Sequence, residues 1–230
     1  MSKTTLAWLV HIYTALGGVL GFFALILAAQ DKISLALSVL LFTVIIDASD
    51  GYFARKLNVS KLTPSFDGAM LDNVIDIFTY AYVPFFIIWK LNILISPIVL
   101  VLPLLGALYA YGQKEMKTAD NYFLGFPTYW NIVAIYFYLI PVSSFVAAFI
   151  LAVLTIMCFI PIRYLYPSKN SMYGKFFTYA GLLWMFGLFI ALSDPTKFHF
   201  LAMITFIYPA IYMALSLYTD YKVRSVKTRR

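Results

Sequence analysis

Charged residues, cysteines and histidines are all scarce in this sequence of 230 residues. Charged residues make up 12% of the chain and hydrophobic residues 63%, whereas a soluble domain has about 25% charged and about 45 to 50% apolar residues. This shortage of charge excludes an ordinary soluble domain and predicts an integral membrane protein. The single cysteine, Cys158, excludes an internal disulfide. The histidines, His11 and His199, have no ligand-spaced partner, and we expect both to be structural or interfacial.

Repeats, low-complexity tracts and long linkers are also missing, so we expect one domain spanning residues 1–230. The apolar runs are numerous, and each needs about 20 residues to cross the hydrocarbon core as a helix. We therefore predict an all-α fold, a polytopic transmembrane bundle of about eight helices. The expected spans lie near residues 8–29, 33–56, 67–89, 92–112, 126–141, 143–162, 174–192 and 199–219.

Basic residues are distributed unevenly between the two sides of this bundle. Fourteen of the 17 Lys and Arg residues fall on the side that holds both termini, and only Lys32, Lys90 and Lys197 fall on the other. The positive-inside rule then places both termini and the 55–67 loop in the cytoplasm. Anionic lipid headgroups account for the net charge of +7, so no nucleic acid partner is expected.

Acidic residues are few, and they are concentrated. Five of the ten occur between positions 47 and 76. Each residue of a helix advances by about 100 degrees, so Asp47 and Asp50 share one face, and Asp72 and Asp76 share one face of the next helix. Two helices joined by a short loop are antiparallel neighbours, so we expect these faces to converge near the cytoplasmic membrane boundary.

Four carboxylates brought together repel one another unless a cation neutralises them. Their oxygens suit Mn²⁺ or Mg²⁺, and the stretch has no His or Cys to favour zinc. We predict a divalent metal site with two ions, the usual arrangement for moving a phosphoryl group. Gly51, Ala54 and Gly68 lie on or beside the acidic faces and leave room for a flat group or for close helix packing. Arg55 can pair with a phosphate.

Carboxylates within a membrane also occur in ion pathways, so a cation transporter is an alternative from another functional class. A transporter predicts inverted repeats or broken helices near the midplane. The sequence has no repeating halves, and its carboxylates cluster at one edge of the membrane, which disfavours transport.

The pattern D-x2-D-G-x2-A-R, followed by G-x3-D-x3-D, resembles the signature of the CDP-alcohol phosphotransferase family. Every fixed position matches, and the residues are Asp47, Asp50, Gly51, Ala54, Arg55, Gly68, Asp72 and Asp76. The resemblance implies an integral membrane enzyme, usually a homodimer, that uses divalent metal to displace CMP from a CDP-linked donor with the hydroxyl of a second alcohol.

The resemblance also implies roles for these residues. Asp47, Asp50 and Asp72 would be metal ligands, and Asp76 would complete the second metal site or act as the catalytic base that takes the proton of the acceptor hydroxyl. The residues implied for binding the CDP moiety are Asp50, Gly51, Ala54, Arg55 and Gly68.

Further features resemble one branch of this family, the bacterial phosphatidylcholine synthases, which join CDP-diacylglycerol to choline. The spacer at 56–67 is longer than in most members, the segment "MKTADNYFLGFPTYWN" at 116–131 looks like the corresponding segment of that branch, and residues 160–169 are similar too. The branch implies a multi-pass protein of the bacterial inner (cytoplasmic) membrane, among membrane lipids, with its active site facing the cytoplasm. Phosphatidylserine synthases have an element similar to "FLGFP" at 123–127, so serine, inositol or glycerol 3-phosphate stay open as acceptors.

Two further groups of residues are predicted to contact the substrates. Aromatic faces hold quaternary ammonium groups, and the choline-site candidates are Tyr129, Trp130, Asn131, Tyr80 and Tyr111. Any one of these tyrosines can instead anchor the membrane interface. Lys117, Arg163 and Lys169 are expected either to hold the lipid phosphate or simply to mark the cytoplasmic side.

Overall fold

The computed structural model describes residues 1–114, 116–118, 120–166 and 173–228. The chain divides into two compact units. The first contains Met1–Leu91 and Trp130–Ile135, and the second contains Asn92–Tyr129 and Tyr136–Arg230. The single domain expected over residues 1–230 therefore stays a prediction, and the units are described separately below.

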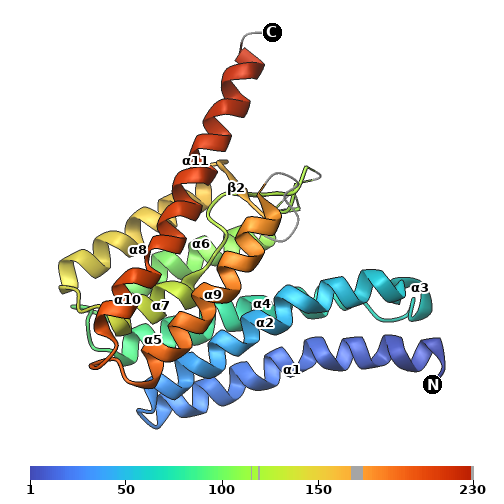
Figure 1. Ribbon diagram of the computed structural model, residues 1–230, viewed down its shortest axis with the longest axis horizontal. Coiled ribbons are helices and arrows are strands. Elements are labelled where there is room, and N and C mark those ends of the chain that lie inside the picture. Colours follow the sequence, from blue (N-terminus) through green and yellow to red (C-terminus); the bar gives the residue numbers. More distant parts are fainter. Residues whose placement is uncertain (115, 119, 167–172, 229–230) are drawn as a thin grey trace. The chain divides into compact units, whose positions relative to one another are not determined.

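The first unit begins with two long antiparallel helices that lie side by side (Figure 1). They are α1 (Lys3–Ala29) and α2 (Ile33–Leu57), and the short helix α3 (Val59–Leu62) follows them. Ser2 caps α1, because its hydroxyl accepts a hydrogen bond of 3.0 Å from the N–H of Thr5. Asn58 ends α2 in the left-handed conformation, with φ of 52°, which asparagine tolerates better than most residues.

The rest of the first unit is a rod of three consecutive helices that packs against α1. These are α4 (Gly68–Ile77), the π-helix η1 (Phe78–Tyr82) and α5 (Val83–Lys90). The Asp67 carboxylate caps α4 by accepting a hydrogen bond of 2.9 Å from the N–H of Met70. The π-helix lies just before Pro84, which has no N–H to donate to the carbonyl of Tyr80. The first six residues of α7 (Trp130–Leu139) complete this unit.

Small residues explain how closely α1 approaches its neighbours. Its buried positions follow one another mostly at intervals of three and four, and they are Ala7, Val10, His11, Thr14, Gly17, Gly21, Ala24 and Ala28. A Cβ atom at Gly17 would lie 3.3 Å from Cγ2 of Ile75, and one at Gly21 would lie 2.7 Å from Cγ2 of Thr79. The glycines therefore let the backbone of α1 lie directly against side chains of α4 and η1.

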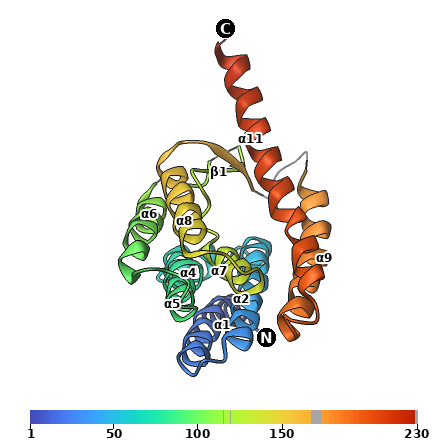
Figure 2. The ribbon, with the colours of Figure 1, turned by 90° about the vertical axis from the view of Figure 1, so that its left-hand side faces the viewer.

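The second unit contains the remaining helices. They are η2 (Pro97–Leu100), α6 (Val101–Gly112), the end of α7, α8 (Ser144–Phe159), α9 (Gly174–Ser193), α10 (His199–Thr205) and α11 (Ile207–Thr228). Helices α6 and α8 lie side by side (Figure 2). Gly106 permits this contact, because a Cβ atom there would lie 3.2 Å from Cγ2 of Thr155.

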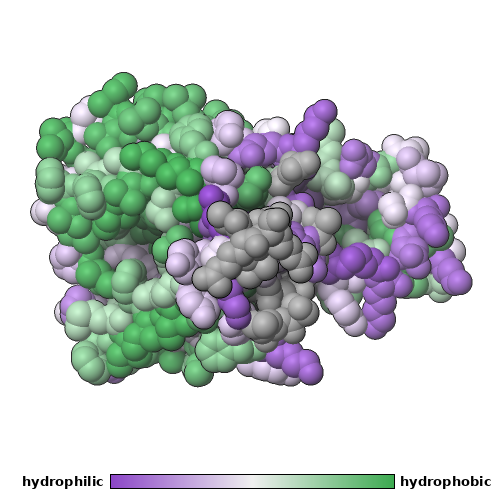
Figure 3. Space-filling view, turned by 90° about the horizontal axis from the view of Figure 1, so that it is seen from above, coloured by the Kyte–Doolittle hydropathy of each residue, from purple (hydrophilic) through white to green (hydrophobic). Residues whose placement is uncertain are grey.

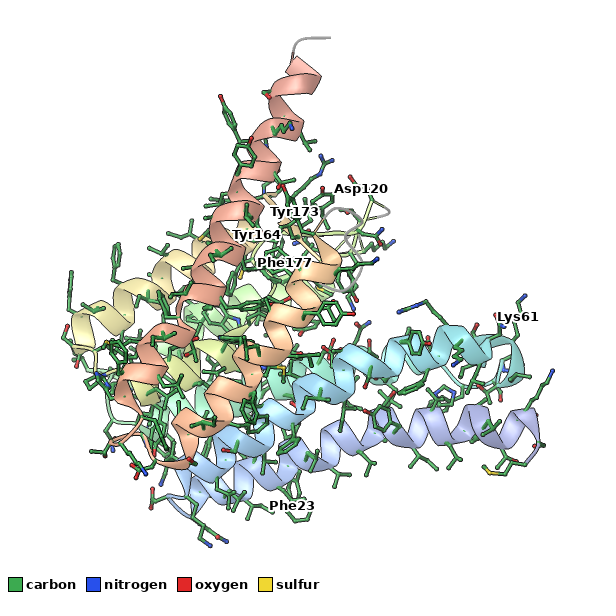
Figure 4. The ribbon with its side chains drawn as sticks, viewed as in Figure 1. Phe23, Lys61, Asp120, Tyr164, Tyr173 and Phe177 are labelled. Atoms are coloured by element: carbon green, nitrogen blue, oxygen red, sulfur yellow. The ribbon has the colours of Figure 1, made fainter. Side chains whose placement is uncertain are left out.

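A small antiparallel sheet, which the all-α prediction did not include, also belongs to the second unit. It pairs β1 (Tyr122–Leu124) with β2 (Arg163–Leu165), and Phe123 lies opposite Tyr164. Figure 4 shows Tyr164 near Phe177, and both belong to one buried cluster with Leu165 and Tyr212.

The other edge of β2 is hydrogen bonded by side chains of α11 spaced four residues apart. Tyr212 donates to the carbonyl of Leu165 at 2.9 Å, and Ser216 accepts from its N–H at 3.1 Å. Asp220 accepts from the N–H of Arg163 at 3.1 Å. One face of α11 therefore satisfies backbone groups that an edge strand would otherwise leave to water.

Five helices of the described chain are long and apolar enough to cross a membrane. They are Lys3–Ala29, Ile33–Leu57, Gly68–Lys90, Gly174–Ser193 and His199–Ser225. Three more of the expected spans coincide with the shorter apolar helices Pro97–Gly112, Trp130–Leu139 and Ser144–Phe159. Prolines lie at or near their ends, where a helix is readily interrupted. The count of eight spans and the cytoplasmic termini stay predictions.

The surface of the first unit fits a membrane-embedded protein. Phe22 and Phe23 on α1 are more than half exposed, and Figure 4 shows Phe23 on the outer side of that helix. Hydrophilic residues gather instead at the right-hand end of the view in Figure 3, where Figure 1 places α3 and the N-terminus. Lys3, Arg55 and Lys61 are exposed there.

Candidate metal centre

Helices α2 and α4 bring three aspartates together, as the helical spacing predicts. One carboxylate oxygen from each of Asp47, Asp50 and Asp72 lies within 4.8 Å of the others. The sequence places Asp47 and Asp50 one turn apart on α2, while the Asp67 cap fixes where α4 starts and hence where Asp72 lies. The predicted convergence of the two acidic faces is confirmed for these three residues.

Asp76 lies one turn beyond Asp72 and is outside this group of three. It still lines the same small cavity as the other aspartates, and the remaining lining residues are Thr14, Gly17, Thr43, Ile46, Ile75 and Thr79. Asp76 is 7% exposed and Asp50 is 5% exposed. The geometry thus separates a cluster of three carboxylates from a fourth, buried carboxylate nearby.

Hydroxyl groups from other helices hold two of the clustered carboxylates. Thr14 on α1 donates to Oδ2 of Asp50 at 2.8 Å, and Tyr80 in η1 donates to Oδ2 of Asp47 at 2.7 Å. Such hydrogen bonds to an ionised carboxylate are short and orient it. They bring no positive charge, so they leave the mutual repulsion of the carboxylates unchanged.

This donor set suits a hard divalent cation. Three carboxylate oxygens at this separation match the ligands that Mg²⁺ and Mn²⁺ take in proteins. The hydroxyl groups of Thr14 and Tyr80 then act as outer partners that orient the ligands. The residues present therefore fit a divalent metal.

The small residues of the motif have different neighbours. At Gly51, a Cβ atom would lie 3.1 Å from Nη1 of Arg55, so the guanidinium folds back over that glycine. Ala54 packs against the buried cluster of Ala7, Val10 and Val59. The small side chain of Ala54 lets α1, α2 and α3 pack closely. Close helix packing is one of the two roles that the sequence predicts for the small residues of the motif.

Comparison with known proteins agrees with this geometry. The model of the family described as CDP-alcohol phosphatidyltransferase matches residues 5–161, which include all four aspartates. The chain belongs to the CDP-alcohol phosphatidyltransferase family.

Curated relatives in several bacteria carry one name. A phosphatidylcholine synthase of Legionella pneumophila is 38% identical over 169 residues, which cover 71% of this chain and 66% of that protein. The phosphatidylcholine synthase of Borreliella burgdorferi is 33% identical over 233 residues, covering 96% of this chain and 97% of that protein. The Pseudomonas aeruginosa protein of the same name is 34% identical over 170 residues, or 71% of this chain and 70% of that protein.

The five choline-site candidates of this CDP-alcohol phosphatidyltransferase have different surroundings. Tyr80 contacts the aspartate cluster directly. Trp130 is fully buried against Phe85, with ring centroids 5.2 Å apart. Asn131 is buried too, and its side-chain oxygen accepts from the N–H of Ile132 at 2.8 Å.

Tyr129 and Tyr111 belong to the second unit, where Tyr129 packs on Tyr212. The five candidates therefore belong to two different units. Tyr80 is hydrogen bonded to Asp47 of the aspartate cluster, and the assignment of all five residues to choline stays a prediction.

The basic candidates for the lipid phosphate lie in or beside the small sheet. Lys117 is exposed and pairs with Phe123 through a β-bridge, in the same row as Tyr164. Arg163 lies in the next row of β2, and neighbouring rows of a strand face opposite sides. Lys169 lies outside the described residues. The register therefore does not favour Lys117 and Arg163 binding one phosphate together.

Tyr164, which follows Arg163 in β2, is buried and stays neutral. Burial raises the pKa of its phenol well above the usual value, and nearby Cys158 and Asp220 raise it further.

Sequence reasoning missed the contacts of three buried polar residues of α1 and α2, two beside the aspartates and one beside Gly68. Thr14 and Thr43 line the cavity, and His11 packs over Gly68. The signal was present on α1, because His11 and Thr14 are one turn apart in the stripe of buried residues. A polar side chain within an otherwise small and apolar stripe indicates a contact with a polar partner.

Proposed function

We propose that this protein transfers the phosphatidyl group of CDP-diacylglycerol to choline, giving phosphatidylcholine and CMP. The observation that carries the proposal is the convergence of the Asp47, Asp50 and Asp72 oxygens within 4.8 Å in a chain of the CDP-alcohol phosphatidyltransferase family. The choice of choline is supported by relatives named phosphatidylcholine synthase, one of which aligns with 96% of this chain.

The aspartate cluster would hold the metal. Asp47, Asp50 and Asp72 would bind the first of two Mn²⁺ or Mg²⁺ ions, which supply positive charge to the diphosphate and to the departing CMP. Thr14 and Tyr80 keep two of these carboxylates in place through their hydroxyl groups. Arg55, folded over Gly51, is placed to donate hydrogen bonds to a phosphate.

Asp76 is assigned the proton transfer. The choline oxygen forms a bond to the phosphorus that carries diacylglycerol, the bond from that phosphorus to CMP breaks, and the hydroxyl proton passes to Asp76. Asp76 suits this role because it lines the same cavity as the metal-binding group and lies outside that group. The hydroxyl of an alcohol has a pKa far above 7, so the transfer accompanies attack.

The location of the cluster matches a donor that is half lipid and half nucleotide. The aspartates lie on helices long and apolar enough to span a membrane, toward the end that carries exposed Arg55 and Lys61. We propose that this end faces the cytoplasm of a bacterial inner membrane and that the acyl chains stay in the bilayer. A homodimer is expected for the family and stays a prediction here.

The test is CMP release from CDP-diacylglycerol by the detergent-purified protein. Choline, serine, inositol and glycerol 3-phosphate are compared as acceptors with Mn²⁺ or Mg²⁺, and lipid products are identified by mass. Choline-dependent release with phosphatidylcholine formed supports the proposal, and Asp50→Asn serves as the inactive control. CMP release with another acceptor refutes choline specificity. No CMP release with any of the four acceptors refutes the proposed reaction and favours the alternative of cation transport.

A further inference from the structure

The space beside Gly68 is occupied by a side chain from another helix. A Cβ atom at Gly68 would lie 2.7 Å from Cε1 of His11 and 3.1 Å from Nδ1. Carbon atoms do not approach to 2.7 Å without displacement, so any larger residue at position 68 would have to move the imidazole or the first turn of α4.

The imidazole of His11 is held on its other sides and cannot move freely. Its Nε2 lies 2.9 Å from the hydroxyl oxygen of Thr63, and that hydroxyl donates its one proton to the carbonyl of Val59. The Thr63 oxygen therefore accepts, which places the imidazole proton on Nε2. Phe66 and Trp8 cover the ring with centroids 4.5 Å and 5.5 Å away, and His11 is only 7% exposed.

The same face of α1 contacts both helices that carry the aspartates. Three positions beyond His11, Thr14 donates to Asp50 of α2, and the next turn places Gly17 against Ile75 of α4. Gly68 and Asp72 are one helical turn apart in α4, so a shift of Gly68 is transmitted to Asp72. Helix α1, which has no carboxylate of its own, thus sets the distance between the two aspartate helices.

We propose that His11 is a positioning residue, which holds the first turn of α4 at the distance that brings Asp72 to Asp47 and Asp50. The imidazole of His11 fills the space beside Gly68, so a side chain larger than that of glycine at this position would displace the imidazole or α4. The proposal rests on the proposed function only for its link to turnover, since the steric contact between the two residues exists whatever the reaction.

A double-mutant cycle tests the packing of His11 against Gly68. The wild type, His11→Ala, Gly68→Ala and the double variant are purified in detergent, and the apparent melting temperature is measured in EDTA and in Mn²⁺. Gly68→Ala alone should lower the melting temperature by about 5 °C, because the added methyl group overpacks the site. In the His11→Ala background the same change should cost nothing or give a small gain. If His11→Ala does not fold, His11→Ser, which also removes the ring, replaces it in the cycle.

Metal dependence tests the positioning role. His11→Ala should need about tenfold more Mn²⁺ to reach half of its full rise in melting temperature, and about tenfold more for half-maximal CMP release. His11→Gln, which keeps a donor for Thr63, should recover part of this loss. An unchanged Mn²⁺ requirement in His11→Ala would overturn the positioning role, since a residue that only fills space would lower the melting temperature in EDTA and Mn²⁺ alike.

Two further results would overturn either the contact between His11 and Gly68 or the proposed function. If Gly68→Ala lowers the melting temperature as much in the His11→Ala background as in the wild type, the imidazole does not limit the space at position 68, and the proposal is wrong. If the wild type releases no CMP, the proposed function fails, while the melting-temperature cycle still decides the contact between His11 and Gly68.

Discussion

Removing one charge from the aspartate cluster should stabilise the metal-free protein while it destroys the metal site. At 4.8 Å and an effective dielectric constant of about 20, two unit charges repel by about 3.5 kcal/mol. Asp72 has two such neighbours, Asp47 and Asp50. Solvent screening at the partly exposed Asp47 and Asp72 weakens this repulsion. Protonating an ordinary aspartate at pH 7 costs about 4 kcal/mol, and this cost is an upper limit on the repulsion that one carboxylate can contribute.

We therefore expect Asp72→Asn to raise the free energy of unfolding of the metal-free protein by about 1 to 3 kcal/mol. For a chain of this size that is a rise of about 2 to 12 °C in the apparent melting temperature. The assay is thermal unfolding of the detergent-purified protein at pH 7, followed by intrinsic fluorescence, first in EDTA and then in Mn²⁺. The wild type should gain stability on adding Mn²⁺ because the ion binds only the folded protein, and Asp72→Asn should gain little.

Asp67→Asn is the matched control, because it removes an equal charge from the start of the same helix. The Asp67 carboxylate caps α4 and does not line the cavity, and asparagine is also a good capping residue. This variant should keep the Mn²⁺-dependent rise and show no gain in EDTA. The reasoning is refuted if Asp72→Asn melts below the wild type in EDTA, or if it keeps a full response to Mn²⁺.

Three further variants test other contacts. Thr14→Val, which loses the hydrogen bond to Asp50, should need about tenfold more Mn²⁺ for half-maximal CMP release, whereas Thr14→Ser should stay near the wild type; equal behaviour of the two contradicts this. Asp76→Asn should abolish CMP release and keep the Mn²⁺-dependent rise in melting temperature, and loss of that rise would instead make Asp76 a metal ligand. Ser216→Ala, which leaves the N–H of Leu165 without its acceptor, should lower the melting temperature by a few degrees in EDTA and Mn²⁺ alike, about 1 to 3 kcal/mol; an unchanged melting temperature contradicts it.

Helix periodicity accounts for what could be predicted about the metal centre. Asp47 and Asp50 share a face of α2 because residues three apart on a helix are neighbours, and this holds wherever the helix is packed. The short connection then made α2 and α4 antiparallel neighbours, so Asp72 could be predicted to join them. The apolar composition likewise predicted a membrane-embedded helical protein, which agrees with five helices long enough to span.

Helix lengths and the small sheet were predicted less well. The expected span 126–141 corresponds to α7, which covers only Trp130–Leu139, because hydropathy does not register where the backbone is interrupted. The strands β1 and β2 are three residues each and lie in segments without a clear alternating pattern. The outer edge of β2 is hydrogen bonded by side chains of α11, including Ser216 and Asp220. The sequence does not reveal this role, because it depends on β2 lying beside α11 in the folded chain.

The sequence by itself determined the membrane class, the identity of the carboxylates and their placement on two helical faces, because these depend on composition and on spacing within single helices. Only the tertiary structure decided which groups hold those carboxylates and which side chain fills the space beside Gly68. Thr14 and Asp50 are 36 positions apart, and His11 and Thr63 are 52 positions apart. No local pattern encodes such pairs, because they form only when the small residues of α1 let it pack closely against both aspartate helices.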